Sequence, residues 1–112
     1  MNRWMHCLVG AVLAGGLILP ALAEDAAPIP VALKDHRFSP SEIHVKANMP
    51  AQILLTNSDG TAEEFDSSAL HVEKVVPAGT KGIVRLAPLA PGRYPFMGEY
   101  HSSTAQGVVV AE

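Results

Sequence analysis

The feature that most constrains the fold of this chain is the spacing of its apolar residues, which alternate with polar residues at a period of two. In the stretch EIHVKA (residues 42–47), every second side chain is apolar, and a glutamate, a histidine and a lysine lie between them. Ile29, Val31 and Leu33 share the same spacing. Because no window of helical length carries an apolar stripe at a period of 3.6 residues, the pattern predicts strands rather than helices.

Further strands are predicted where short apolar runs are separated by residues that favour turns. The runs are AQILLTN, LHVEKVV, GIVRLA, RYPFMGEY and GVVV, and the segments between them include NSDG, PAGTKG, PLAPG and HSSTAQG. About seven short strands at regular spacing are typical of two packed sheets with Greek-key connections. We therefore predict an all-β fold, a Greek-key antiparallel β-sandwich.

The N-terminal residues have the pattern of a secretory signal peptide. Arg3 supplies a positive charge, residues 8–19 are apolar, and the sequence PALA, which ends at Ala23, supplies the small residues that a signal peptidase reads. A membrane anchor is the alternative, but this apolar stretch is shorter than the roughly 20 residues that a spanning helix needs. We expect residues 1–23 to be a signal peptide that is cleaved after Ala23.

Cleavage would leave a flexible lead-in over residues 24–30 and one domain over residues 31–112. The single cysteine, Cys7, would leave with the signal peptide. The exported protein would therefore have neither a disulfide nor a thiolate ligand. Without Arg3, seven of the eight Lys and Arg residues would remain against eleven Asp and Glu. This mildly acidic balance gives no indication of nucleic-acid binding.

Two longer segments resemble the cupredoxin-like family. FSPSEIHVKANMPAQILLTNSDG (residues 38–60) is similar to the first half of that family, with Phe-x-Pro, an Ile-x-Val strand, and an apolar strand that ends in Asn. LAPLAPGRYPF (residues 86–96) is similar to the second half, where Pro-Gly-x-Tyr leads into the strand before the metal-binding loop. The resemblance extends over about residues 31–111 and implies a cupredoxin-like sandwich.

The resemblance also shows which ligands of a blue-copper site are missing. Such a site uses one His from the first half of the chain, and a Cys, a His and a Met on the last loop. Here Glu63 or Glu64 stands at the first His position, Gly98 stands at the Cys position, and SSTAQG after His101 contains no Met. Only His101 remains, so blue-copper electron transfer is excluded.

A narrower resemblance is to cysteine-poor cupredoxin-like proteins associated with periplasmic ferrous-iron uptake. It rests on Glu64-Phe65-Asp66, on GEYH with the following Thr-Ala-x-Gly, and on HVEKVVPAG. Some relatives carry cysteines near the positions that Phe38 and Gly98 occupy here. Because this chain has no cysteine at either position, a ligand role there does not transfer. The resemblance implies a periplasmic protein that captures iron beside an inner-membrane iron permease, with copper as another candidate ion. Whether it also oxidises ferrous iron stays open.

Strand ends from both halves of a cupredoxin-like chain meet at one pole, so EEFD and GEYH are expected to lie together there. The candidate metal ligands are Glu63, Glu64, Asp66, Met97, Glu99 and His101, with His44 as a weaker candidate. Which of Glu63 and Glu64 faces the site stays open. Carboxylates with one imidazole suit Fe²⁺, Fe³⁺, Mn²⁺ or Cu²⁺, and Met97 would shift the preference towards copper.

The remaining histidines are weaker candidates, and two functions stay open. His36 in KDHRF is more typical of a surface position, whereas His71 in LHVEKVV could lie under the site or on the surface, and no familiar zinc-site spacing is present. The first function is a metal-binding protein of an iron-uptake system that uses copper or iron ions. The second is a metal-free β-sandwich module that serves as a scaffold of a periplasmic membrane complex, with the acidic pole as its docking surface.

Overall fold

The computed structural model describes residues 15–16 and 27–112. Apart from residues 15–16, the expected signal peptide and its cleavage site after Ala23 lie outside the described residues, as do residues 24–26 of the expected lead-in. The first strand begins at Ile29, so the last two residues of the expected lead-in are part of a sheet. Within the described residues, no helix has the length and apolar character needed to cross a membrane.

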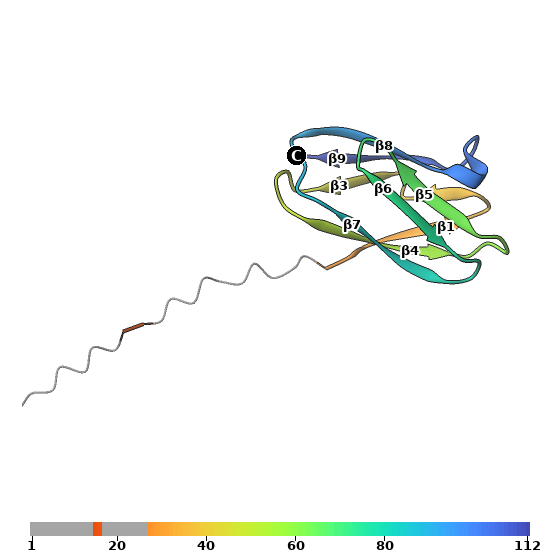
Figure 1. Cartoon of the computed structure of the whole chain (residues 1–112), viewed down its shortest axis with the longest axis horizontal. Coiled ribbons are helices and arrows are strands. Elements are labelled where there is room, and N and C mark those ends of the chain that lie inside the picture. Colours follow the sequence, from red (N-terminus) through yellow and green to blue (C-terminus); the bar gives the residue numbers. More distant parts are fainter. Residues whose placement is uncertain (1–14, 17–26) are drawn as a thin grey trace, which may run out of the picture.

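Strands dominate residues 27–112, and they pack as two layers (Figure 1). The elements are β1 (Ile29–Lys34), β2 (Arg37–Ser39), β3 (Glu42–Val45), β4 (Ala51–Asn57), β5 (Glu63–Ser67), β6 (Val72–Val76), β7 (Lys81–Leu86), β8 (Gly92–Gly98), the short 3-10 helix η1 (Glu99–His101) and β9 (Gln106–Ala111). One sheet has the order β2-β1-β4-β7 and the other has the order β3-β9-β8-β5-β6. The predicted all-β sandwich is confirmed.

The strand pairing differs from the expected purely antiparallel pattern, because both sheets are mixed. β1 pairs in parallel with β4, and β3 pairs in parallel with β9. Alternation identifies the buried face of a strand but not its neighbour, so the sequence could not reveal these two pairs. The strands beyond the expected set are β2, which has three residues, and β5, in which Phe65 is the one apolar side chain.

Three phenylalanine rings join the two sheets beneath one end of the sandwich. Phe38 comes from β2, whereas Phe65 and Phe96 come from β5 and β8 of the other sheet. The ring centroids of Phe65 and Phe96 lie 4.6 Å apart, and Phe38 meets Phe96 edge-to-face at 5.1 Å. These are favourable aromatic geometries. Because side chains two residues apart on a strand share a face, Glu63 and Gly98 continue the same inner surface towards the pole.

His44 lies on the outer face of β3, near the C-terminal end of β9. Its Nδ1 atom is 2.7 Å from Glu112 Oε1, and its Nε2 atom is 3.0 Å from Glu42 Oε1. The hydrogen bond to Glu112 is the largest influence on the His44 pKa, and with the charges of both glutamates it raises that pKa above the usual 6.5. Figure 1 shows that the C terminus lies at the end of the sandwich opposite to the blue loop that contains η1.

We expect substitution of His44 by glutamine to destabilise the protein more at about pH 5.5 than at about pH 8.5. A raised pKa in the folded state gives stabilisation that is fully present below the unfolded pKa and is lost as the pH rises through the folded pKa. Thermal unfolding followed by circular dichroism at both pH values measures the difference. In a Glu112→Gln background most of this pH dependence should disappear. An equal effect of His44→Gln at both pH values would contradict the prediction.

Candidate metal centre

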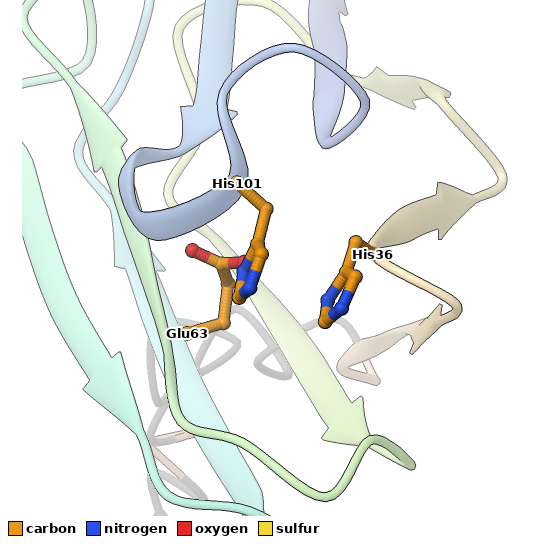
Figure 2. A group of neighbouring side chains, drawn as sticks. All are labelled: His36, Glu63 and His101. Carbon is orange, nitrogen blue, oxygen red and sulfur yellow. The ribbon is translucent and has the colours of Figure 1, made fainter.

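Three side chains from separate parts of the chain meet at the pole of the sandwich that contains η1. His36 comes from the turn between β1 and β2, Glu63 from the start of β5, and His101 from the end of η1. Figure 2 shows the three side chains pointing towards one another. One ligand atom from each residue lies within 4.8 Å of the others. We call these three residues the inner centre.

Glu63 is the buried member of the inner centre, with only 1% of its surface exposed. It shares the inward face of β5 with Phe65, so the alternation of the strand places Glu63 inside and Glu64 outside. Its Oε1 atom accepts the backbone N–H groups of Tyr100 at 2.9 Å and Glu64 at 3.1 Å. Its Oε2 atom lies 2.6 Å from His101 Nδ1. Every oxygen of this buried carboxylate is therefore paired, as burial of a charged group requires.

Gly98 makes room for the Glu63 carboxylate. A Cβ atom at position 98 would lie 2.6 Å from Glu63 Cδ and 2.7 Å from the Ala105 side chain, closer than such atoms approach one another. A side chain at position 98 and the carboxylate would therefore compete for one space. The resemblance assigns this position to the thiolate of a blue-copper site, and here a carboxylate occupies that volume.

His101 is held between this carboxylate and a second imidazole. Its ring stacks on the ring of His36, with centroids 3.6 Å apart and planes inclined by 10°. The loop that follows η1 is closed by backbone hydrogen bonds from Gly98 N to Ala105 O at 2.8 Å and from Ala105 N to His101 O at 2.9 Å. His101 is therefore a fixed side chain on a closed loop, with 27% of its side chain exposed.

His36 reaches the inner centre because of the backbone of its turn. Asp35 and His36 form the two-residue loop between β1 and β2, with φ angles of 52° and 56°, as in a type I′ hairpin turn. The carboxylate of Asp59 accepts the backbone N–H groups of both residues, at 2.7 Å and 3.0 Å. The bond from the His36 backbone is the main cause that lowers the pKa of Asp59, and it keeps this carboxyl ionised.

The structure divides the sequence-derived candidates between the two faces of β5. Glu63 and His101 meet inside, whereas Glu64, Asp66 and Glu99 form a separate group on the outside, with ligand atoms within 4.8 Å of one another. We call this group the outer acidic cluster. Met97 lies opposite Asp66 in the β5–β8 pairing and is 41% exposed, so it belongs to the outer face. His44 lies at the other end of the sandwich and contacts glutamates instead.

The structure brings His36 into the inner centre, whereas the sequence favours a surface position for it. In the sequence it is one polar residue in a polar stretch, KDHRF, and no spacing connects it with His101. A two-residue loop between two alternating segments is a signal for a hairpin. That signal could have placed His36 at the tip of a turn, but the stacking of its ring on His101 depends on how the two sheets pack.

The outer acidic cluster concentrates negative charge beside the inner centre. Burial and then the charge of Glu99 raise the pKa of Glu64. Partial loss of contact with water and then the charge of Glu64 raise the pKa of Tyr100 in the same way. Each negative charge opposes the formation of the next, and a cation near the cluster would relieve this repulsion.

The inner centre offers two imidazole nitrogens and one carboxylate oxygen. This donor set is of borderline hardness and fits a divalent transition-metal ion, whereas it contains no thiolate for a blue-copper site. His101 Nδ1 and Glu63 Oε2 are 2.6 Å apart, a separation that holds a proton between them. An ion bound to both atoms would replace that proton, so metal and proton compete for the site.

Comparison with known protein families gives one family match and one sequence relative. The family model described as cupredoxin-like domain matches residues 7–111. An uncharacterized protein of Rickettsia prowazekii (strain Madrid E) is 38% identical over 82 residues, which cover 73% of this chain. The matched segment spans 66% of that relative, slightly less than two thirds of its length.

Solved structures share the architecture at low sequence identity. The metal-binding domain of the Cu(I)-exporting P-type ATPase CopA of Streptococcus pneumoniae D39, with Cu(I), aligns with a TM-score of 0.65 at 15% identity, over 76% of this chain and 84% of that one. The purple cupredoxin of Nitrosopumilus maritimus aligns with a TM-score of 0.56 at 13% identity, over 75% and 99% of the two chains. Similarity at these identities concerns the fold, and it confirms the expected cupredoxin-like sandwich.

Replacement of Gly98 by alanine should destabilise the protein by about 1–3 kcal/mol, because the added methyl group overpacks the space that holds the Glu63 carboxylate. Gly60→Ala is the matched control, because a Cβ atom there would meet nothing within 4 Å. Urea unfolding of both variants measures the difference in the free energy of unfolding. Equal stability of the two variants would show that the carboxylate can move aside without cost.

Proposed function

Because the chain belongs to the cupredoxin-like domain family, we propose that it binds a copper ion through His36, Glu63 and His101. The observation that carries the proposal is the convergence of these three donors, with one ligand atom of each within 4.8 Å of the others. They lie at the pole where the resemblance places the metal site of cupredoxin-like proteins. The solved metal-binding domain with Cu(I), which has the same fold, supports the choice of ion.

Copper suits this donor set for a chemical reason as well. Among divalent first-row ions, Cu²⁺ binds a given nitrogen and oxygen site most tightly, and imidazole is a common ligand for it. A bound copper ion would supply a redox-active centre. His36 and His101 would provide nitrogen donors, and the buried charge of Glu63 would offset the charge of the ion. Without a thiolate, such a site would exchange its metal more readily than a blue-copper site.

We also propose that the protein handles iron in the periplasm, after export and cleavage at Ala23. The outer acidic cluster supports this role, because carboxylate oxygens suit Fe²⁺ and Fe³⁺ and the cluster lies on the face of β5 opposite to Glu63 of the inner centre. An Fe²⁺ ion captured there would give one electron to Cu²⁺ in the inner centre, which leaves Fe³⁺ and Cu⁺, or would be passed on to an inner-membrane iron permease. This role extends the copper proposal, and it can fail while the copper proposal stands.

A metal-free interaction module is the alternative function. Its support is the same outer face, where Met97 and Tyr100 are 41% and 52% exposed beside the acidic cluster. On this alternative, the outer face would contact a membrane complex and the inner centre would serve only to hold the loops together. Metal titration separates the two functions, because the alternative requires no ion.

Titration of the purified protein with Cu²⁺ should give one tightly bound ion, and His36→Ala or His101→Ala should weaken binding by at least about tenfold. Loss of a residue that only supports a ligand already lowers metal affinity by about 10–100-fold, so loss of a ligand itself should cost at least the lower end of that range. Isothermal titration calorimetry against a competing chelator measures the affinity. His71→Asn, at an exposed turn with a φ angle of 55° that asparagine tolerates, is the control. No binding by the wild-type protein would favour the metal-free module, and unchanged affinity of both alanine variants would refute this ligand assignment.

Neutralisation of the outer acidic cluster should separate iron handling from copper binding. In the variant with Glu64→Gln, Asp66→Asn and Glu99→Gln, we expect Cu²⁺ affinity to change little, because the inner centre is intact. Fe²⁺ binding, and any Fe²⁺ oxidation by the copper-loaded protein, should decrease. A colorimetric assay of remaining Fe²⁺ measures both. If the wild-type protein neither binds nor oxidises Fe²⁺, the iron role fails while the copper proposal stands.

A further inference from the structure

The His36 ring has one polar atom whose surroundings the inner centre does not explain. Nδ1 of His36 is buried and has no hydrogen-bond partner among the described residues. The Oδ2 atom of Asp59 lies 3.4 Å from it. A buried polar atom without a partner is costly. The unpaired Nδ1 atom therefore calls for an explanation, and the carboxylate beside it is the obvious candidate partner.

Asp59 is itself held firmly in place. Its backbone N–H donates to Asn57 Oδ1 at 3.0 Å. The Asn57 side chain is 1% exposed, and its Nδ2 atom donates to the backbone oxygens of Thr61 at 2.9 Å and Val76 at 3.0 Å. The carboxylate of Asp59 in turn accepts both backbone N–H groups of the hairpin turn that carries His36. A buried amide network therefore fixes the position of this carboxylate and, through it, the turn.

Asp59 does not belong to the set of direct ligands. The group of residues with ligand atoms within 4.8 Å of one another contains His36, Glu63 and His101 but not Asp59. Its Oδ2 atom lies beside Nδ1 of His36, at 3.4 Å, and a carboxylate often accepts the second ring N–H of a metal-bound histidine. The two imidazoles therefore differ: Nδ1 of His101 faces the candidate ligand Glu63 at 2.6 Å, whereas Nδ1 of His36 faces a carboxylate outside the ligand group.

We propose that Asp59 is a positioning residue for metal binding: it anchors the hairpin turn and keeps a proton on Nδ1 of His36, so that Nε2 is free to bind the ion. The proposal deepens the proposed function and rests on His36 being a ligand. A carboxylate at Nδ1 selects the neutral tautomer whose lone pair is on Nε2. A small rotation of the ring or carboxylate on metal binding would shorten the present 3.4 Å separation to a hydrogen bond.

The test is a double-mutant cycle of Cu²⁺ affinity with Asp59→Asn, His36→Ala and the pair. Asp59→Asn should weaken Cu²⁺ binding by about 10–100-fold in the otherwise wild-type protein. It should cause little further loss when His36 is already alanine. Asp35→Asn is the matched control, because its side chain lies on the same turn and asparagine tolerates its φ angle of 52°. The control should bind Cu²⁺ like the wild type.

Two results of the cycle would overturn the proposal. Wild-type affinity in Asp59→Asn would mean that the carboxylate has no role at His36. An equal loss in the His36→Ala background would mean that Asp59 acts through the fold rather than through that ring.

A second measurement needs no variant and no metal. Nitrogen-15 NMR of the neutral His36 ring in the metal-free wild-type protein should find the proton on Nδ1. A neutral ring with its proton on Nε2 would overturn the proposal even if Asp59→Asn does not fold. If the wild-type protein binds no Cu²⁺, the proposed function fails and the role of Asp59 in metal binding fails with it, while this measurement still decides whether Asp59 fixes the tautomer of His36.

Discussion

The carboxylate of Glu63 is the group on which this end of the molecule depends. A charge that is almost fully removed from water must be paired, and apart from the neighbouring Glu64 its partners here come from one segment of the chain. Tyr100 supplies a backbone N–H group, and His101 supplies a ring nitrogen. Gly98 supplies the empty volume. The path of the chain from β8 through η1 is therefore arranged around one side chain of β5.

The sequence indicates much of the fold because the fold rests on alternation. The apolar residues of β1, β3 and β4 identify their own buried faces. The parallel pairing of β1 with β4 could not be read in the same way, since it depends on which strands become neighbours after folding. β5 was hardest to recognise, because two of its three buried residues, Glu63 and Ser67, are polar.

The site was harder to anticipate than the fold, for a related physical reason. Glu63 and Glu64 are adjacent and chemically identical, and only the direction of the strand decides which one faces the interior. His36 and His101 are far apart in the sequence, and their stacking requires both sheets to be in place. Residue types thus predict carboxylates and a histidine at the pole, whereas the division into an inner centre and an outer acidic cluster depends on which face of β5 each side chain takes in the folded sheet.

The stacked imidazoles join the two sheets at this pole, in addition to the phenylalanine contacts between them. His36 belongs to the β1–β2 hairpin of one sheet, and His101 ends η1, which follows β8 of the other sheet. An ion held by both rings would link the two sheets at this pole. Release of the ion and separation of the two sheets there would then be a single event, so a partner that moved the β1–β2 hairpin away from η1 would release the ion without contacting it.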